Sequence, residues 1–162
     1  VADIASVIAK KMHFPEDRIM YLKMAGSIHD IGKISVPSEI LSKPGKLSES
    51  EMNIIREHPL TGYEILNEVE FPYPLADIVY QHHERLDGSG YPKGLKGDHI
   101  YRDAKILAVA DVVEAISSHR PYRPALGKSF ALDEIKKNKG RLYDPKVVEV
   151  CCQAIESGEI SM

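Results

Sequence analysis

Apolar residues recur along this chain at spacings of three and four, and the alternation typical of strands is scarce. Such spacing places side chains on one face of an α-helix, so the pattern predicts an all-α chain with little or no sheet. The breaks in the pattern fall at proline and glycine, which indicates a single bundle of about seven helices. The expected helical stretches are residues 2–12, 15–32, 48–58, 60–69, 75–86, 103–118, 129–139 and 145–157.

Local signals support these boundaries. Ser48 and Glu51 have the spacing of a capping box, which favours a helix start at residue 48. Pro59 disfavours helical backbone at the residue before it, so one helix should end near His58. Residues 87–99 hold too many backbone-breaking residues for regular structure, and we expect a loop there. These residues are Gly88, Gly90, Pro92, Gly94 and Gly97.

Several ionisable side chains fall on faces that should be buried. His82 and His83 share the apolar face of the helix predicted over 75–86. Asp111 is surrounded by apolar one-turn neighbours, and His29 and Asp30 interrupt an apolar run. A buried, unpaired carboxylate costs several kcal/mol, so each of these groups needs a strong partner. Taken one at a time, a helical histidine is commonly a satisfied core residue and a buried aspartate commonly pairs with arginine.

A shared divalent metal centre would satisfy all of these groups together. Imidazole beside carboxylate suits Mn, Fe, Zn, Co or Ni, and no cysteine has the spacing of a structural zinc site. A single ion with room for substrate takes fewer than six protein ligands, so we expect two ions bridged by the carboxylate of Asp30. The candidate ligands are His29, Asp30, His58, His82, His83 and Asp111.

Composition narrows the remaining function classes. The 162 residues suit one domain, and 21 basic against 24 acidic residues leave a net charge of −3, which does not favour a DNA or RNA duplex or an anionic membrane as partner. No apolar run approaches the length of a membrane span, so we expect a cytoplasmic protein without membrane contact. Cys151 and Cys152 are neighbours on a predicted helix, and we interpret them as reduced core or surface thiols.

Four motifs together resemble a known family. They are HDIGKI (29–34), HP (58–59), HHERLDGSGYPKGLKGDHI (82–100) and ADVVEAISSHRPYR (110–123). The chain resembles the HD-GYP domains of bacterial signalling proteins, a branch of the HD metal-dependent phosphohydrolases, over nearly its whole length. The resemblance implies an all-helical fold and hydrolysis of cyclic di-GMP to pGpG and, in some members, on to GMP.

The resemblance also implies roles for single residues. It makes the same six side chains metal ligands, with iron or manganese expected and Zn, Ni or Co as alternatives. Lys33 follows His29 by four residues and should face the site, where its ammonium can stabilise charge on a phosphoryl oxygen. Substrate contacts are implied for Arg120, Arg123, Gly90 and Tyr91, although a role of Gly90 and Tyr91 in folding the loop is an equal alternative. Glu84, Arg85 and Asp87 should shape that loop.

The chain also departs from the fuller family pattern. Members with a third ion take a glutamate and a histidine from a segment that would precede Val1, so a third ion is not expected here. We expect residues 1–162 to be an HD-GYP domain excised from a longer signalling protein, with its first helix truncated. An upstream regulatory domain or a diguanylate cyclase partner would then act on it.

The expected mechanism is attack on phosphorus by a water that bridges the two ions. Two alternatives stay open. One is a module that binds cyclic di-GMP, or a partner protein, without turnover, and the other is an HD phosphohydrolase of a different nucleotide.

Overall fold

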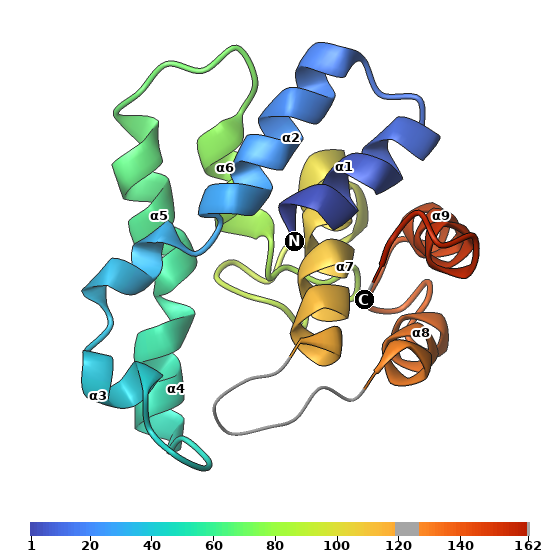
Figure 1. Cartoon of the computed structure of the whole chain (residues 1–162). Helices are drawn as coiled ribbons and strands as arrows, with labels where there is room; N and C mark the ends of the chain where they lie inside the picture. Colours follow the sequence, from blue (N-terminus) through green and yellow to red (C-terminus); the bar gives the residue numbers. More distant parts are fainter. Residues whose placement is uncertain (119–126, 162) are drawn as a thin grey trace.

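The computed structural model describes residues 1–118 and 127–161, and within them the chain is a helical bundle (Figure 1). Pairing of the β type is limited there to two isolated bridges, so the predicted all-α class is confirmed. No helix in the described residues is both long enough and apolar enough to cross a membrane. The elements are α1 (Ala2–Lys11), α2 (Glu16–Ile28), η1 (Ile31–Ser35, a 3-10 helix), α3 (Ser38–Leu41), α4 (Glu49–Arg56), α5 (His58–Asn67), α6 (Leu75–Gln81), η2 (Gly97–His99, a 3-10 helix), α7 (Arg102–Ser117), α8 (Lys128–Lys137) and α9 (Pro145–Glu156).

Helix α7 is the central element of the bundle. It contacts α1, α2, α6, α8 and α9, and in Figure 1 it runs between α8 and α9 on one side and α5 and α6 on the other. Ile106, Leu107 and Val109 are fully buried on different sides of α7, as expected for a helix that is apolar around most of its circumference. Arg18 of α2 donates two hydrogen bonds, of 3.0 and 2.5 Å, to the buried carboxylate of Asp103, and this pair fastens α2 to α7.

The C-terminal helices complete the core. The predicted helix near 145–157 is α9, and Cys151 and Cys152 are buried free thiols within it. The capping box predicted for Ser48 and Glu51 is present at the start of α4, with both reciprocal hydrogen bonds formed. The segment 87–99 is irregular apart from η2, as predicted.

Two helices end earlier than their apolar patterns predict. Helix α2 ends at Ile28 instead of near Gly32, and the chain continues as the tighter η1. Helix α6 ends at Gln81 instead of continuing to residue 86. The amide of Leu86 donates to the Leu142 carbonyl at 3.1 Å, so tertiary hydrogen bonds replace those that a longer α6 would have formed. Both early endings leave predicted site residues just beyond a helix.

Close packing of η1 on α5 depends on Gly32. A Cβ atom at this position would lie 1.9 Å from the carbonyl oxygen of His58 and 2.7 Å from the amide nitrogen of Gly62. Both atoms belong to the backbone of a helix and cannot move aside at low cost. Glycine at residue 32 therefore allows η1 to lie against the first turn of α5.

We predict that Gly32→Ala lowers the free energy of unfolding by about 3 kcal/mol, because the added methyl group forces η1 away from α5. Urea denaturation followed by circular dichroism measures this loss. Gly62→Ala is the matched control on the other side of the same contact. The one tight contact of its Cβ would be with a side-chain atom of Val79, at 3.2 Å, and alanine is the better helix former, so the change should stay within about 1 kcal/mol. Equal losses in the two variants would contradict this account.

Candidate metal centre

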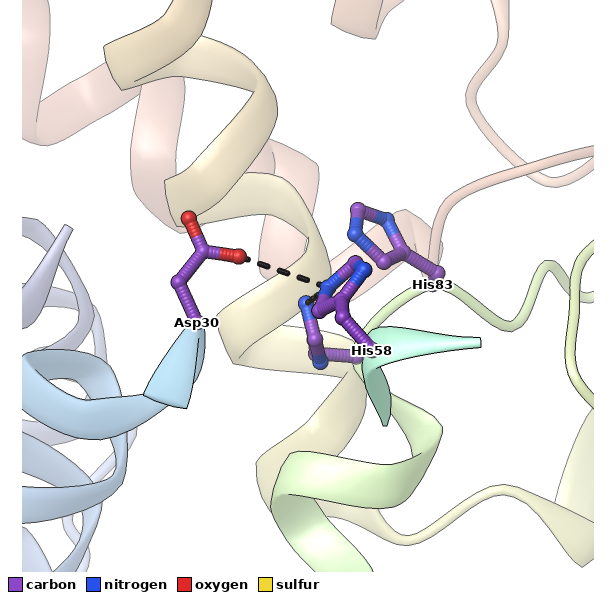
Figure 2. A group of neighbouring side chains, drawn as sticks. Asp30, His58 and His83 are labelled. Carbon is purple, nitrogen blue, oxygen red and sulfur yellow. Dashed lines mark hydrogen bonds and ion pairs between the residues drawn. The ribbon is translucent and has the colours of Figure 1, made fainter. Parts of the chain in front are cut away.

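Four predicted ligands come together where helices begin and end (Figure 2). Asp30 immediately precedes η1, His58 is the first residue of α5, and His82 and His83 follow the last residue of α6. One ligand atom from each of the four lies within 4.8 Å of the others. The rings of His58 and His82 are essentially buried. Segments more than fifty residues apart in the sequence therefore share one compact polar cluster.

Three histidine rings are held in the same way. In each, Nδ1 lies within hydrogen-bond distance of the backbone carbonyl three residues earlier in the chain. A carbonyl oxygen can only accept, so Nδ1 carries the proton and Nε2 of a neutral ring presents its lone pair. The contacts are His29 with Gly26 at 2.8 Å, His58 with Ile55 at 2.7 Å and His82 with Val79 at 2.5 Å.

These lone pairs are directed at one another. Nε2 of His58 lies 3.4 Å from Nε2 of His82 and 3.3 Å from Oδ1 of Asp30, so three acceptor atoms converge. Burial lowers the pKa of His58 and lowers that of His82 to about 4, which disfavours a shared proton as the positive group between them. Close acceptors without a proton between them favour binding of a cation. The donor set of imidazole nitrogen and carboxylate oxygen fits a divalent metal ion.

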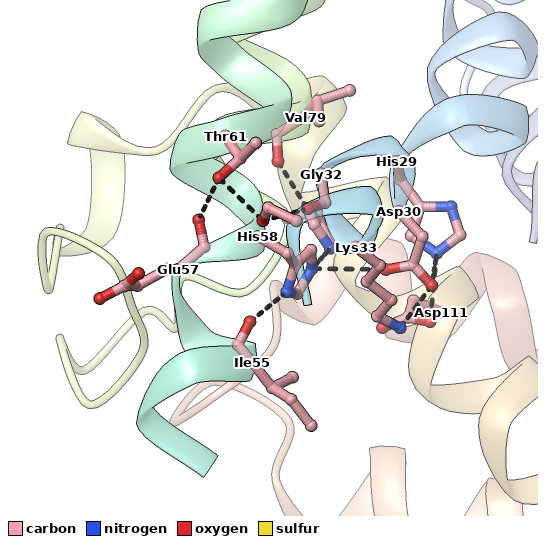
Figure 3. Close-up of polar contacts among 12 residues, drawn as sticks. His29, Asp30, Gly32, Lys33, Ile55, Glu57, His58, Thr61, Val79 and Asp111 are labelled. Carbon is pink, nitrogen blue, oxygen red and sulfur yellow. Dashed lines mark hydrogen bonds and ion pairs between the residues drawn. The ribbon is translucent and has the colours of Figure 1, made fainter. Parts of the chain in front are cut away.

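The second oxygen of Asp30 faces a different group of side chains (Figure 3). Oδ2 lies 3.5 Å from Nε2 of His29, and the same nitrogen lies 3.7 Å from Oδ1 of Asp111. Burial lowers the pKa of His29, but attraction to the nearby carboxylates of Asp111 and Asp30 outweighs burial and raises it. Burial raises the pKa of Asp111, and interactions with His29, His83 and His82 outweigh burial and lower it. Asp30 thus lies between two groups of potential ligands.

Lys33 contacts the same carboxylate, but it does so from an element that the sequence pattern did not predict. The expected helix shared with His29 ends at Ile28, and Lys33 instead lies in η1, three residues after Asp30. Its Nζ donates to Oδ2 of Asp30 at 2.6 Å. The prediction that Lys33 shares a helix face with His29 was therefore wrong, although the Lys33 ammonium does lie at the cluster.

Glu84, the residue after His83, holds the loop 87–99 beside the metal centre. This buried carboxylate accepts hydrogen bonds from the amides of Lys93 and Leu95, at 2.8 and 2.9 Å. Gly90 approaches the backbone of residues 83–85 so closely that a Cβ would lie 2.4 Å from the His83 carbonyl oxygen. Close contacts within the chain are thus enough to explain why residue 90 is a glycine.

Arg85 and Asp87 also shape this loop. Arg85 donates to the backbone carbonyls of His82 and Glu84, at 3.3 and 2.8 Å. Asp87 accepts hydrogen bonds from the amide and the hydroxyl of Ser89. These contacts agree with the predicted shaping of the loop by polar side chains.

Tyr91 connects the loop to the metal centre. Its ring stacks on that of His83 with 4.7 Å between the centroids and 24° between the planes. Burial raises the pKa of Tyr91 to about 12, so its hydroxyl stays protonated at neutral pH and can act as a hydrogen-bond donor. Arg120 and Arg123, the other predicted substrate residues, lie outside the residues that the structure describes.

Sequence reasoning missed the carbonyl groups that orient the histidines. They belong to Gly26, Ile55 and Val79, whose side chains carry no functional group for this purpose. A uniform offset of three residues before each histidine is the signal that could have revealed them. It becomes meaningful only once each histidine is known to lie at a helix boundary.

Comparisons with known proteins show what this chain is similar to. The family model described as HD domain matches residues 1–147. The chain is 43% identical over 151 residues to the cyclic di-GMP phosphodiesterase response regulator RpfG of Xanthomonas campestris pv. campestris, covering 92% of this chain and 40% of the relative. It is 37% identical over 146 residues to the 3′3′-cGAMP-specific phosphodiesterase 3 of Vibrio cholerae, covering 90% of this chain and 32% of the relative.

A solved structure shows the same fold. Bd1817, a HDG"Y"P protein from Bdellovibrio bacteriovorus, superposes with a TM-score of 0.77 at 17% identity, covering 96% of this chain and 50% of that chain. At this identity the likeness concerns the arrangement of the helices. The chain spans less than half the length of the two curated relatives.

The buried histidines predict how stability depends on pH in the metal-free chain. The pKa values of His58, His82 and His83 are lowered by burial, so below pH 6.5 the unfolded chain binds protons that the folded chain resists. Their contribution to stability is present above pH 6.5 and is lost as the pH falls toward 4. The raised pKa of His29 changes stability with pH in the opposite direction, but His29 is one group and the histidines with lowered pKa values are three.

We therefore predict that the free energy of unfolding is lower at pH 5 than at pH 7, by on the order of 1–2 kcal/mol. Urea titrations of chelator-treated protein at the two pH values measure it. His82→Gln should reduce the difference, since glutamine does not titrate. Equal or greater stability at pH 5 would contradict the assignment of neutral, buried rings.

Proposed function

This chain belongs to the HD domain family, and we propose that it is a metal-dependent phosphodiesterase that hydrolyses cyclic di-GMP to pGpG. The observation that carries the proposal is the convergence of unprotonated Nε2 atoms on the carboxylate of Asp30. The identity of the proposed substrate is supported by the motifs that resemble HD-GYP domains and by the relative named as a cyclic di-GMP phosphodiesterase.

We assign the six predicted ligands to two ions that share Asp30. Oδ1 of Asp30 faces His58, and Oδ2 faces His29, which lies beside Asp111. This division of the two oxygens supports a bridging role. Mixed imidazole and carboxylate ligation is compatible with iron or manganese, which we propose as the physiological metals, and also with zinc, nickel or cobalt.

Hydrolysis adds one water across a phosphodiester bond. Oxygen from water forms a new bond to phosphorus, the bond to the 3′ oxygen breaks, and that oxygen takes up a proton. Bound divalent ions would acidify water and neutralise charge on the phosphate.

The chain's own residues would bind and orient the substrate. The Lys33 ammonium, held at Asp30, would stabilise negative charge on a phosphoryl oxygen. The protonated hydroxyl of Tyr91 would donate to the phosphodiester, and Arg120 and Arg123 would bind its phosphates.

A second substrate is favoured by one comparison. The relative from Vibrio cholerae is named as specific for 3′3′-cGAMP, which differs from cyclic di-GMP in one base. We therefore keep cGAMP as an alternative substrate for the same centre. A sensor that binds without turnover would need the same ligands and is separated from an enzyme by product analysis.

We also propose that other regions control this activity. One relative is named a response regulator and is much longer than the matched segment, which supports an upstream regulatory domain or a diguanylate cyclase partner. A cytoplasmic location and a cyclic di-GMP signalling context belong to the same proposal.

Product analysis tests the proposed function. Chain purified without chelator and carrying about two ions should convert cyclic di-GMP to pGpG, as followed by chromatography, with the metals counted in the same sample. Asp30→Ala should lose both metal and activity, because it removes the shared ligand. Asp3→Ala, which changes an exposed aspartate on α1, should retain both.

Lys33→Met separates charge stabilisation from metal binding. It should keep the metal content and lower kcat by about a hundredfold, since one positive group at the phosphate is lost. Fully metallated protein that binds cyclic di-GMP but forms no product would favour the sensor. Full metal content in Asp30→Ala would contradict the bridging assignment.

A further inference from the structure

A pocket of about 530 Å³ lies beside the metal centre, between α3, the following turn and α4. Its size is within the range of roughly 300–1,000 Å³ that small-molecule sites occupy. The walls are mainly apolar and come from Ile40, Leu41, Leu47, Met52 and Ile55. Leu41 and Met52 remain partly exposed, each with 37% of its surface accessible. The pocket is thus an open apolar cavity and not a filled part of the core.

The pocket and the metal centre share two residues. Lys33 lines the pocket and also donates to Asp30 at 2.6 Å. Ile55 lines the pocket, and its carbonyl oxygen accepts the hydrogen bond from Nδ1 of His58 at 2.7 Å. Figure 3 shows Ile55 and Lys33 on either side of the His58 ring. A phosphodiester held at the centre would have the pocket as its immediate neighbour.

The turn that forms one wall is held in place. Nζ of Lys43 contacts both carboxylate oxygens of Glu51, at 2.7 and 2.8 Å. Glu51 also accepts from the amide of Ser48, whose hydroxyl accepts from the amide of Glu51. The pocket is therefore formed before any ligand arrives, which lowers the entropic cost of binding.

The remaining lysine of the pocket has a free charge. Lys46 is exposed at the rim, and no ion pair involves it among residues 1–118 and 127–161. The pocket thus combines apolar walls with one positive group near the metal centre and one at the outer edge. Planar, uncharged purine rings flanked by phosphates match this distribution of surface and charge.

We propose that this pocket binds one purine base of the cyclic dinucleotide and does not distinguish guanine from adenine. The inference rests on the proposed function and names the specificity of the same site. Leu47 and Met52 would contact the faces of the base, and the thioether of Met52 adapts to different ring substituents. Lys33 and Lys46 would contact the phosphates on its two sides.

The absence of selectivity follows from the side chains of the lining. Guanine presents donors at N1 and N2 that a selective site meets with a carboxylate or amide acceptor. No side chain of the lining residues carries such an acceptor, because a lysine ammonium can only donate. Lysine can donate to O6 and N7 of guanine, but Lys43 is paired with Glu51, and Lys33 and Lys46 would contact the phosphates. Strong rejection of a base requires a polar partner left unsatisfied by the wrong ligand, and no side chain of the lining is then left for that role.

Filling the pocket tests the inference. We predict that Met52→Trp raises KM by roughly tenfold or more for both cyclic di-GMP and 3′3′-cGAMP, because indole would occupy the space of the base. Metal content should stay unchanged. The kcat for bis(4-nitrophenyl) phosphate, a phosphodiester without a purine, should change by less than about twofold. The unmodified chain should show KM values for the two dinucleotides within about tenfold of each other.

A matched control variant isolates the role of the pocket. Met24→Trp makes the same change on α2 at a methionine of matched exposure, 38% against 37%, and should leave KM unaltered. An unchanged KM in Met52→Trp for either dinucleotide would overturn the inference. So would a preference of more than about a hundredfold for one dinucleotide in the unmodified chain.

Failure of the proposed function gives a different result. If the metallated chain hydrolyses neither dinucleotide, calorimetric titration of each one measures Kd in place of KM for the same variants. If Met52→Trp alone then binds both dinucleotides more weakly, the pocket assignment is supported although the proposed enzymatic activity is contradicted. Binding that is absent, or equal in all variants, would overturn the pocket assignment.

Discussion

The structure brings together acceptor atoms whose mutual repulsion a cation relieves. Backbone carbonyls fix the protons of His58 and His82 on Nδ1, and their bare Nε2 atoms then meet each other and, from His58, the carboxylate of Asp30. Burial keeps His58 and His82 neutral, so protonation is a costly remedy. A divalent ion turns the same convergence into ligation. Fold stability and chemistry are thus coupled at one point.

The helical framework brings that point together. The candidate ligands other than Asp111 come from residues at which helices begin or end, because a helix terminus allows a side chain to turn away from the helix while its backbone stays anchored. Gly32 lets η1 touch α5 and so places Asp30 beside His58. Central α7 contributes Asp111 from the other side. Glu84 then fastens the loop that carries Tyr91 over His83.

The sequence predicted the helical fold because its apolar spacing reports helix faces, and it predicted the cluster because adjacent ionisable pairs rarely share buried faces. It misplaced the ends of α2 and α6. In both, the apolar pattern continues past the last helical residue, and tertiary contacts of Gly32 and Leu86 end the helix instead. The contact of Lys33 with Asp30 and the pocket beside Ile55 depend on those endings, so periodicity alone could not reveal them.

The central claim is that Asp30 joins two metal ions. Anomalous X-ray diffraction from crystals of metal-loaded protein, collected on both sides of the metal absorption edge, locates the ions directly. The account predicts two anomalous peaks flanking the Asp30 carboxylate, one beside Nε2 of His58 and His82 and the other beside His29 and Asp111. A single peak, or peaks away from Asp30 in fully loaded protein, would contradict it.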